Sequence, residues 1–426
     1  MEPSRRNEVE GTAAPGSAKI YRGGTHRCRR PADTLARVLP LAAQMGITRL
    51  ANVTGLDSIG IPVYMASRPL SRSVAVSQGK GLTAEEAKVS AFMEAAETYH
   101  AENITAPIKM ASLNELGERH AVIDVSGLPY SALGAFHSER RILWIEGERL
   151  GTGRDASLWV PLELVSTDFT LPQPPGSFAF PANTNGLASG NSLEEAQLHA
   201  LCELIERDAL SLWRLGGDAV RAASKLDPAT VESSAAQSLL ARYRDAGLNV
   251  GLWDVTADTG VPVFCCAVAE PSDTAVEAEL GAGCHPDREV ALLRALTEAA
   301  QSRTTRIAGS RDDYVPESYD SAAKLARNRT AQLWLSDPPR RSFADTPNLA
   351  GQTIDEDLGA VLARLAALGM DQVVSVDLSK PEVGIPVARV VVSGLEGAYQ
   401  GEGSDYRPGN RARARGLTLP TWRPEV

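Results

Sequence analysis

The sequence predicts a fold of the α+β or α/β class. Helical and strand-like stretches alternate throughout the 426 residues, and Pro- and Gly-rich loops such as 171–176 (LPQPPG) separate them. Two apolar runs have the form of buried strands: VPVFCCAVA at 261–269, and VARVVVSGLEG at 387–397, which runs into a turn. A chain of this length can bury a sizeable core, in two lobes or in one large domain with extensions.

The N-terminal segment 1–18 (MEPSRRNEVEGTAAPGSA) carries charged and small polar residues without an apolar run. We therefore expect a disordered arm, neither a signal peptide nor a membrane anchor, and a cytoplasmic protein that does not bind membranes. The chain has 43 basic and 53 acidic residues, a formal charge of −10. This balance disfavours a nucleic-acid binder, because such binding depends on neutralising phosphates with Lys and Arg.

The five cysteines form no CxxC pair and lack the spacing of a zinc site. Two of them are neighbours, Cys265 and Cys266, within the apolar run at 261–269. We expect all five to be small core residues in a reducing compartment. The sequence therefore offers no sulfur-relay pair of its own.

An internal repeat is the most informative feature of the sequence. Three segments that begin at Thr83, Ser192 and Asp287 align without a gap, and each begins with a residue type that caps helix N-termini. Alanine follows after four and eight residues, glutamate after eleven, and glutamate or glutamine after fourteen: Ala87, Ala91, Glu94 and Glu97; Ala196, Ala200, Glu203 and Glu206; Ala291, Ala295, Glu298 and Gln301. The repeat predicts three helices built on one template.

The glutamates of these helices allow two interpretations. A solvated amphipathic helix also carries glutamate opposite its apolar face, and 83–86 and 192–195 have the form of capping boxes. However, the faces around Glu94 and Glu203 carry small residues, which suit close approach by another group and are unusual neighbours for solvated glutamates. Like charges at i and i+3 also weaken an isolated helix, and divalent cations would reverse that penalty. We therefore expect a metal–phosphate site.

The third helix strengthens this interpretation, because Arg294 lies one turn before Glu298 and suits an anionic group held beside the carboxylates. Other motifs are lacking. There is no GxxxxGK[ST], and 79–81 (GKG) is too short for a phosphate loop. No Ser-His-Asp or Cys-His arrangement is evident, and we interpret the six scattered histidines as structural. A di-iron bundle would need a Glu-x-x-His motif on each of two helices, and only the first of these helices carries one, Glu97 with His100.

Three stretches together resemble the YcaO superfamily: SQGKG with EAAET (77–98), NTNGLASGNSLEEAQLHALCELIERDA (183–209) and RALTEAAQSR (294–303). The resemblance runs from about Arg27 to Arg415. It implies an α+β fold with mixed β-sheets, in which three quasi-repeated Glu-bearing helices form an ATP/Mg²⁺ site. The implied division of the chain is the arm 1–18, a YcaO domain at 19–415 with core motifs in 77–313, and a tail at 416–426.

The resemblance implies roles for individual residues. Arg294 and Glu298 would be catalytic, and Glu298 would also bind metal. The remaining Mg²⁺ ligands would be Glu94, Glu97, Glu203 and Glu206. The nucleotide would be bound by Arg294 together with Asn191, Glu195, Arg207 and, from the segment THRCRRPADT, Arg27 and Thr34. One residue departs from the family pattern: Thr98 stands where arginine is usual, so one contact is lost or supplied elsewhere.

Members of this family use ATP to activate a backbone amide of a peptide or protein. The segments 46–69 and 385–397 look most like the branch that works with a TfuA-like partner and forms thioamides, which requires a sulfide donor. An azoline-forming cyclodehydratase is the first alternative, although this chain ends LPTWRPEV and not in the proline-rich tail frequent in that branch. The second is a non-catalytic accessory factor for ribosomal-protein methylthiolation. The sequence is compatible with a homodimer but does not fix the oligomeric state.

Overall fold

The structure of the chain is a computed structural model that describes residues 18–151, 156–271, 278–311, 320–401 and 404–419. The predicted disordered arm lies outside the described residues except for its last residue, and the predicted tail 416–426 is described only to 419. Within the described part, the strands form three sheets with helices packed between and around them. The predicted α+β class is therefore confirmed.

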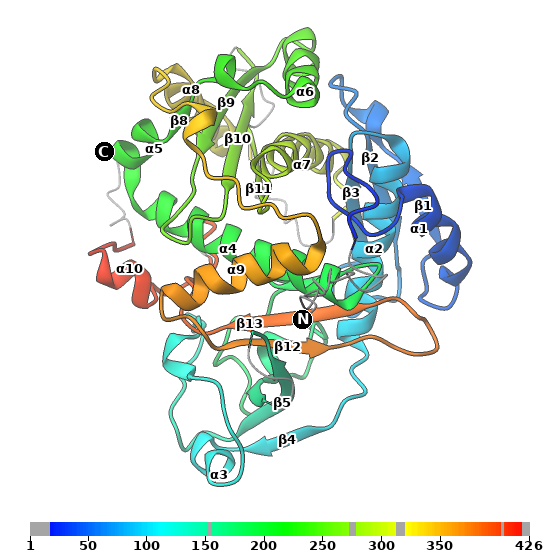
Figure 1. Cartoon of the computed structure of the whole chain (residues 1–426), viewed down its shortest axis with the longest axis vertical. Helices are drawn as coiled ribbons and strands as arrows, with labels where there is room; N and C mark the ends of the chain where they lie inside the picture. Colours follow the sequence, from blue (N-terminus) through cyan, green and yellow to red (C-terminus); the bar gives the residue numbers. More distant parts are fainter. Residues whose placement is uncertain (1–17, 152–155, 272–277, 312–319, 402–403, 420–426) are drawn as a thin grey trace, which may run out of the picture.

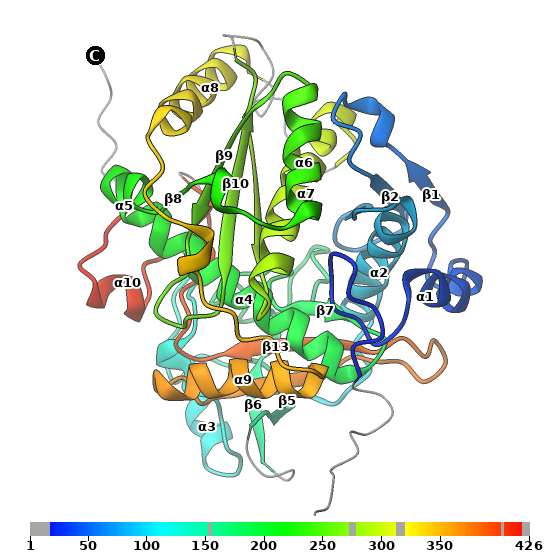
Figure 2. The same cartoon turned by 45° about the horizontal axis from the view of Figure 1, so that its top comes forward.

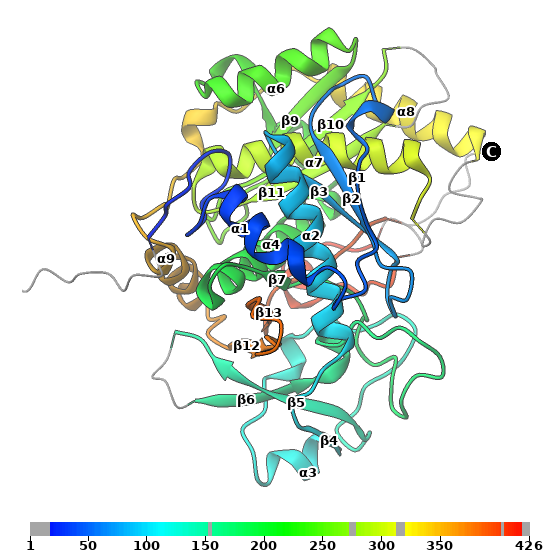
Figure 3. The ribbon, with the colours of Figure 1, turned by 90° about the vertical axis from the view of Figure 1, so that its right-hand side faces the viewer.

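The first sheet is a three-stranded antiparallel sheet near the N-terminus. Its order is β1-β2-β3, with β1 at Arg49–Asn52, β2 at Val63–Ser67 and β3 at Val76–Lys80. Helix α2 (Ala84–Glu102) packs on β2 and β3, and α1 (Pro31–Val38) lies against α2 (Figure 3).

The second sheet explains the continuous apolar run at 261–269. Its order is β11-β10-β9-β8, with β8 at Lys225–Leu226, β9 at Asn249–Asp254, β10 at Val263–Ala269 and β11 at Glu279–Cys284. All seven residues of β10 are buried, because α6 (Ser234–Asp245) and α7 (Arg288–Ala308) cover one face and α4 (Leu193–Leu215) covers the other. Helix α8 (Ser321–Ser336) also contacts β9 and β10. The predicted buried strand is confirmed.

The third sheet holds the second predicted strand. Its order is β4-β5-β12-β13-β7, and β6 pairs with β5; the strands are β4 (Ile108–Ala111), β5 (Ile142–Arg149), β6 (Ser157–Pro161), β7 (Leu187–Ser189), β12 (Val373–Asp377) and β13 (Val387–Val392). Helix α4 packs on β13, and α9 (Ile354–Ala367) packs on α4. The short helices are α3 (Leu113–Gly117), α5 (Gly217–Ala223) and α10 (Asn410–Ala414). Figures 1 and 2 show α4 crossing the middle of the molecule, between the sheet that holds β9 and β10 and the sheet that holds β13.

The sequence repeat corresponds to three strand–helix units: β3–α2, β7–α4 and β11–α7. The three predicted caps are present, since the side chains of Thr83, Ser192 and Asp287 accept backbone N–H groups of the first helical turn. The capping boxes are only half formed. The Glu86 carboxylate accepts the N–H of Leu82, and the Glu195 carboxylate turns to other donors, so neither closes the box on its own cap.

The small residues of the repeat make room for strands. A Cβ on Gly79 of β3 would lie 2.0 Å from the nitrogen of Ala91 and 2.2 Å from the oxygen of Ala87. On β11, a Cβ on Gly283 would lie 2.1 Å from the oxygen of Ala291. Backbone therefore rests directly on backbone in the first and third units. The close approach expected at Ala87 and Ala91 is therefore confirmed, and the approaching group is the strand of the same unit.

In the part of the chain that the structure describes, no helix combines the length and the apolar character needed to cross a bilayer.

Candidate functional site

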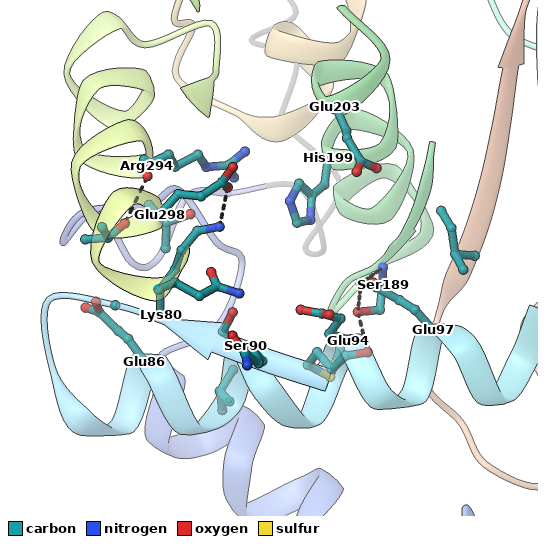
Figure 4. A pocket seen from close by; sticks show the side chains of 18 of the residues that line it. Lys80, Glu86, Ser90, Glu94, Glu97, Ser189, His199, Glu203, Arg294 and Glu298 are labelled. Atoms are coloured by element: carbon teal, nitrogen blue, oxygen red, sulfur yellow. Dashed lines mark hydrogen bonds and ion pairs between the residues drawn. The ribbon is translucent and has the colours of Figure 1, made fainter. Parts of the chain in front are cut away.

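The three strand–helix units meet around a cavity of about 610 Å³, a volume typical of small-molecule sites. Helices α2, α4 and α7 each present glutamates to it, and Figure 4 shows them converging from three sides. Every predicted site residue lines this cavity: Arg27, Thr34, Glu94, Glu97, Asn191, Glu195, Glu203, Glu206, Arg207, Arg294 and Glu298. Residues up to 271 positions apart in the sequence thus share one site.

Backbone N–H groups orient four of the carboxylates. Each donor belongs to β3, β7, β11 or the residue before β7, so the strand of a unit positions a glutamate of its own or a neighbouring unit. The donor–acceptor pairs are Gln78 with Glu94, Ser189 with Glu97 (2.8 Å), Gly186 with Glu203 (3.0 Å), and Ala282 with Glu298 (3.3 Å). The Ser189 hydroxyl adds a second bond to Glu97 at 2.7 Å.

Burial and mutual repulsion make these carboxylates weak acids. Burial, with a smaller contribution from Glu203, raises the pKa of Glu94 to about 7. For Glu97, burial and the neighbouring Glu94 raise the pKa to about 8. Burial also raises the pKa of Glu206 to about 7, with repulsion by Glu298 and Glu203 acting against the attraction of Arg207. A site that holds several ionised carboxylates together favours added cations.

Cations from the chain balance part of this charge. The Arg207 guanidinium lies 3.3 Å from both Glu203 and Glu206 on its own helix, and the ammonium of Lys80 lies 2.6 Å from Glu298. Burial pushes the pKa of Glu298 upward, but Lys80 and Arg207 outweigh it, and the pKa is lowered.

Arg294 differs from Arg207. Within the described residues it forms no ion pair with a carboxylate, and one of its nitrogens donates to the backbone oxygen of Cys284 at 3.1 Å. Burial and the nearby Arg27 lower its pKa. Its charge therefore remains available to an anionic ligand in the cavity.

The N-terminal segment closes one end of the cavity. Glu195, only 3% exposed, accepts bonds from the guanidinium of Arg27 at 3.2 Å and the N–H of Cys28 at 2.9 Å. The Thr34 hydroxyl donates to the side chain of Asn191 at 2.9 Å. The first residues of α4 thus hold this segment against the site.

A buried group, His26, His285 and Asp357, anchors the same segment. Their side chains lie close enough to hold a metal ion. However, the ammonium of Lys19 lies 2.5 Å from the Asp357 carboxylate, and Nδ1 of His285 accepts the N–H of Asp287 at 2.9 Å. Two of the three side chains thus already have partners. We therefore interpret the cluster as a structural contact that holds the N-terminal segment in place.

An arginine from another element lies beside Thr98, the position where the family pattern has arginine. Arg68 is the residue that follows β2. Its guanidinium donates to the Thr98 hydroxyl at 2.7 Å and forms an ion pair with the Glu102 carboxylate at 2.8 Å. All three side chains are buried. A guanidinium therefore lies beside Thr98, although Glu102 neutralises it.

Two polar residues among the others that line the cavity are Lys80 and His199, to which the sequence analysis gives no role. Lys80 lies in the GKG stretch that is too short for a phosphate loop, and His199 is one of the scattered histidines. A signal for His199 existed, because it lies four residues from both Glu195 and Glu203 and so shares their helix face. Burial, Arg294 and Arg27 lower its pKa well below the usual value, and Figure 4 shows it between Glu203 and Arg294.

The donor set suits magnesium and a polyphosphate. Mg²⁺ prefers oxygen ligands and is usually bound by one or two carboxylates together with substrate phosphates. The paired carboxylates with raised pKa values supply the oxygens, and Arg294 supplies a charge for phosphate. The residues present therefore fit the two groups that the sequence predicts.

Comparison with protein families gives a match over residues 78–396 to a family described as YcaO cyclodehydratase, ATP- and Mg²⁺-binding. A relative from Rhizobium leguminosarum bv. trifolii, an uncharacterized protein in the tfuA 3′ region, is 39% identical over 385 residues, 88% of this chain and 90% of that protein. The family description names both cofactors that the sequence predicts, and the predicted family is confirmed.

Solved structures agree on the fold. YcaO from Methanopyrus kandleri, bound with AMPPCP and Mg²⁺, is 25% identical with a TM-score of 0.70, over 89% of this chain and 94% of that one. A heterocyclase in complex with substrate and cofactor has a TM-score of 0.75 at 23% identity, over 99% of this chain. The chain spans 58% of that heterocyclase, and a likeness at this identity concerns the fold alone.

The raised pKa values predict how stability depends on pH without metal. The pKa of Glu97 is about 8 in the folded chain against an ordinary 4.5, so its ionisation destabilises the fold progressively as pH rises from about 5 to 8. In excess chelator, we expect Glu97→Gln to be more stable than wild type by roughly 4 kcal/mol at pH 8 and by less than about 1 kcal/mol at pH 5. The introduced amide oxygen can still accept the bonds from Ser189.

Urea denaturation at the two pH values measures this difference. Glu194→Gln, at an exposed carboxylate on the same helix as Glu203, is the matched control and should show no such dependence. Added Mg²⁺ should stabilise wild type more at pH 8 than at pH 5, because protons compete for the carboxylates. Equal stability of Glu97→Gln and wild type across the range would contradict a destabilising carboxylate at this position.

Proposed function

The chain belongs to the YcaO family, and we propose that it uses ATP and Mg²⁺ to activate a backbone amide of a peptide or protein by O-phosphorylation, leading to a thioamide. Convergence of eleven predicted site residues on one cavity is the observation that carries amide activation by ATP. The relative in the tfuA 3′ region supports the thioamide branch and a TfuA-like partner.

The chemistry begins with a poor leaving group, the amide oxygen. Transfer of the γ-phosphoryl group from Mg²⁺-bound ATP converts this oxygen into phosphate, which leaves readily. In the proposed site, the glutamates of α2, α4 and α7 bind and orient, and Glu298 lies on the same helix face as Arg294. Arg294 neutralises negative charge on the transferred group, and the N-terminal segment closes the nucleotide end of the cavity.

The sulfur has to come from outside the chain. All five cysteines are free and buried, and burial raises the pKa values of Cys265, Cys266 and Cys284, which makes them poor nucleophiles. An external sulfide donor attacking the activated carbon would replace oxygen with sulfur.

Azoline formation is the competing function, and the family description, YcaO cyclodehydratase, favours it. In that reaction a Cys, Ser or Thr of the substrate attacks the same carbon and water is lost. Both reactions share the ATP-dependent step, so the site residues proposed here serve either one.

The proposed site predicts how the nucleotide binds. Binding of AMPPCP should require a divalent cation, because Glu94, Glu203 and Glu298 repel a triphosphate that reaches the empty cavity. We expect titration calorimetry to give at least about a hundredfold weaker binding in excess chelator than with Mg²⁺. Undiminished binding in chelator would remove the basis for the site.

Substitution of Arg294 tests whether the site performs phosphoryl transfer or only binds the nucleotide. We expect Arg294→Ala to lower ATP turnover about a hundredfold and AMPPCP affinity by less than about tenfold, because its charge matters most in the transition state. Turnover and affinity are measured on the same preparation, with Arg413→Ala, an exposed arginine on α10, as control. Equal losses in both quantities would indicate a passive nucleotide clamp, as in an accessory factor.

The product distinguishes the two enzymatic functions. With ATP, Mg²⁺, a TfuA-like protein, sulfide and peptides encoded beside the gene, mass spectrometry should detect a gain of about 16 Da, the exchange of one oxygen for sulfur. Omission of sulfide should abolish the product. Loss of water from a Cys, Ser or Thr in sulfide-free buffer would overturn the thioamide assignment and leave amide activation intact.

A further inference from the structure

Lys80 occupies a central place in the cavity that neither its motif nor the family description assigns. It is the last residue of β3, and its ammonium lies 2.6 Å from Oε2 of Glu298 on α7. The two side chains are each 24% exposed and come from elements 218 residues apart in the sequence. Figure 4 shows Lys80 reaching across the cavity from β3 to this carboxylate.

One ammonium acts on carboxylates from all three repeated helices. The attraction of Lys80 opposes the effect of burial on the pKa of Glu94 on α2 and of Glu206 on α4. It is also the strongest of the interactions that lower the pKa of Glu298 on α7. Lys80 thus balances charge at the point where the three helices converge, as a bound cation would.

Arg207 and Lys80 differ in how easily each can leave its carboxylate partner. Arg207 is tied to Glu203 and Glu206 by its place on the same helix, four residues from one and adjacent to the other. Lys80 comes from a separate strand, and its four-carbon stem ends in a compact charge that can rotate away from Glu298. A divalent cation bound by Glu298 would repel an ammonium 2.6 Å from that carboxylate.

We propose that Lys80 is a cation with two positions, one on Glu298 while the cavity holds no divalent ion, and one on the terminal phosphate of ATP once Glu298 binds metal. This inference rests on the proposed function for its second position. Lys80 keeps its protons throughout. As the bond from the γ-phosphorus to ADP breaks and the bond to the amide oxygen forms, its charge stabilises the transferred group.

The exchange predicts opposite effects of one substitution on two ligands. Lys80→Gln removes a competitor for Glu298, so Mn²⁺ alone, without nucleotide, should bind about tenfold more tightly than to wild type. The same substitution removes a phosphate ligand, so AMPPCP with saturating Mg²⁺ should bind about tenfold more weakly. Electron paramagnetic resonance of free Mn²⁺ and titration calorimetry measure the two affinities.

Two further variants sharpen the test. Lys88→Gln removes the same charge from α2 at a residue that does not line the cavity, and both affinities should match wild type. Lys80→Arg keeps the charge and should keep wild-type Mn²⁺ affinity, and Lys80→Met removes the charge but keeps the stem, so it replaces Lys80→Gln if that variant does not fold.

The outcomes separate this inference from the proposed function. An Mn²⁺ affinity that is unchanged or lower in Lys80→Gln would overturn the exchange. If Lys80 were merely structural, its substitution would lower the affinities for Mn²⁺ and AMPPCP together or change neither. Failure of wild type to bind Mn²⁺ and AMPPCP at all would overturn the proposed function itself.

Discussion

The cost of desolvating several carboxylates in one cavity, increased by repulsion among them, is the constraint on which the rest of this structure depends. Glutamates from three helices share one cavity, and burial keeps the pKa values of Glu94, Glu97 and Glu206 near 7 or 8. Such an arrangement is unfavourable for a chain folding alone, because each ionised carboxylate loses hydration and meets like charges. The scaffold must hold the helices together against this repulsion.

The scaffold meets this demand with backbone contacts. Gly79 and Gly283 bring their strands directly onto the helix backbone at Ala87, Ala91 and Ala291. Backbone N–H groups of the strands then donate to the glutamates, as Ser189 does to Glu97. The alanines of the repeat therefore pack against the strands, and the glutamates line the cavity. Because the spacing between alanine and glutamate on the helix is constant, the position of the strand fixes the position of the carboxylate.

Cations of the chain reduce the repulsion between the carboxylates when no metal is bound, and they supply charge for the proposed ligands. Arg207 and Lys80 pair with three carboxylates and balance part of their charge, whereas Arg294 has no carboxylate partner among the described residues. A site with its counter-ions already in place can exchange them for metal without a large rearrangement of the backbone. The paired cations Arg207 and Lys80 and the unpaired Arg294 are thus as much a part of the site as the glutamates.

The sequence by itself determined the repeat, its three caps, the buried strands within 261–269 and 387–397 and, through the family resemblance, eleven of the residues that line the cavity. The repeat, caps and strands follow from local periodicity, and the site residues follow from motifs, whose information lies within a few turns of chain. Only the tertiary structure decided that Lys80 meets Glu298, that Arg68 lies beside Thr98, and that the small residues face strands. Each of these contacts depends on which elements pack together across long sequence separations. Local periodicity does not predict which residue of another element a side chain will contact.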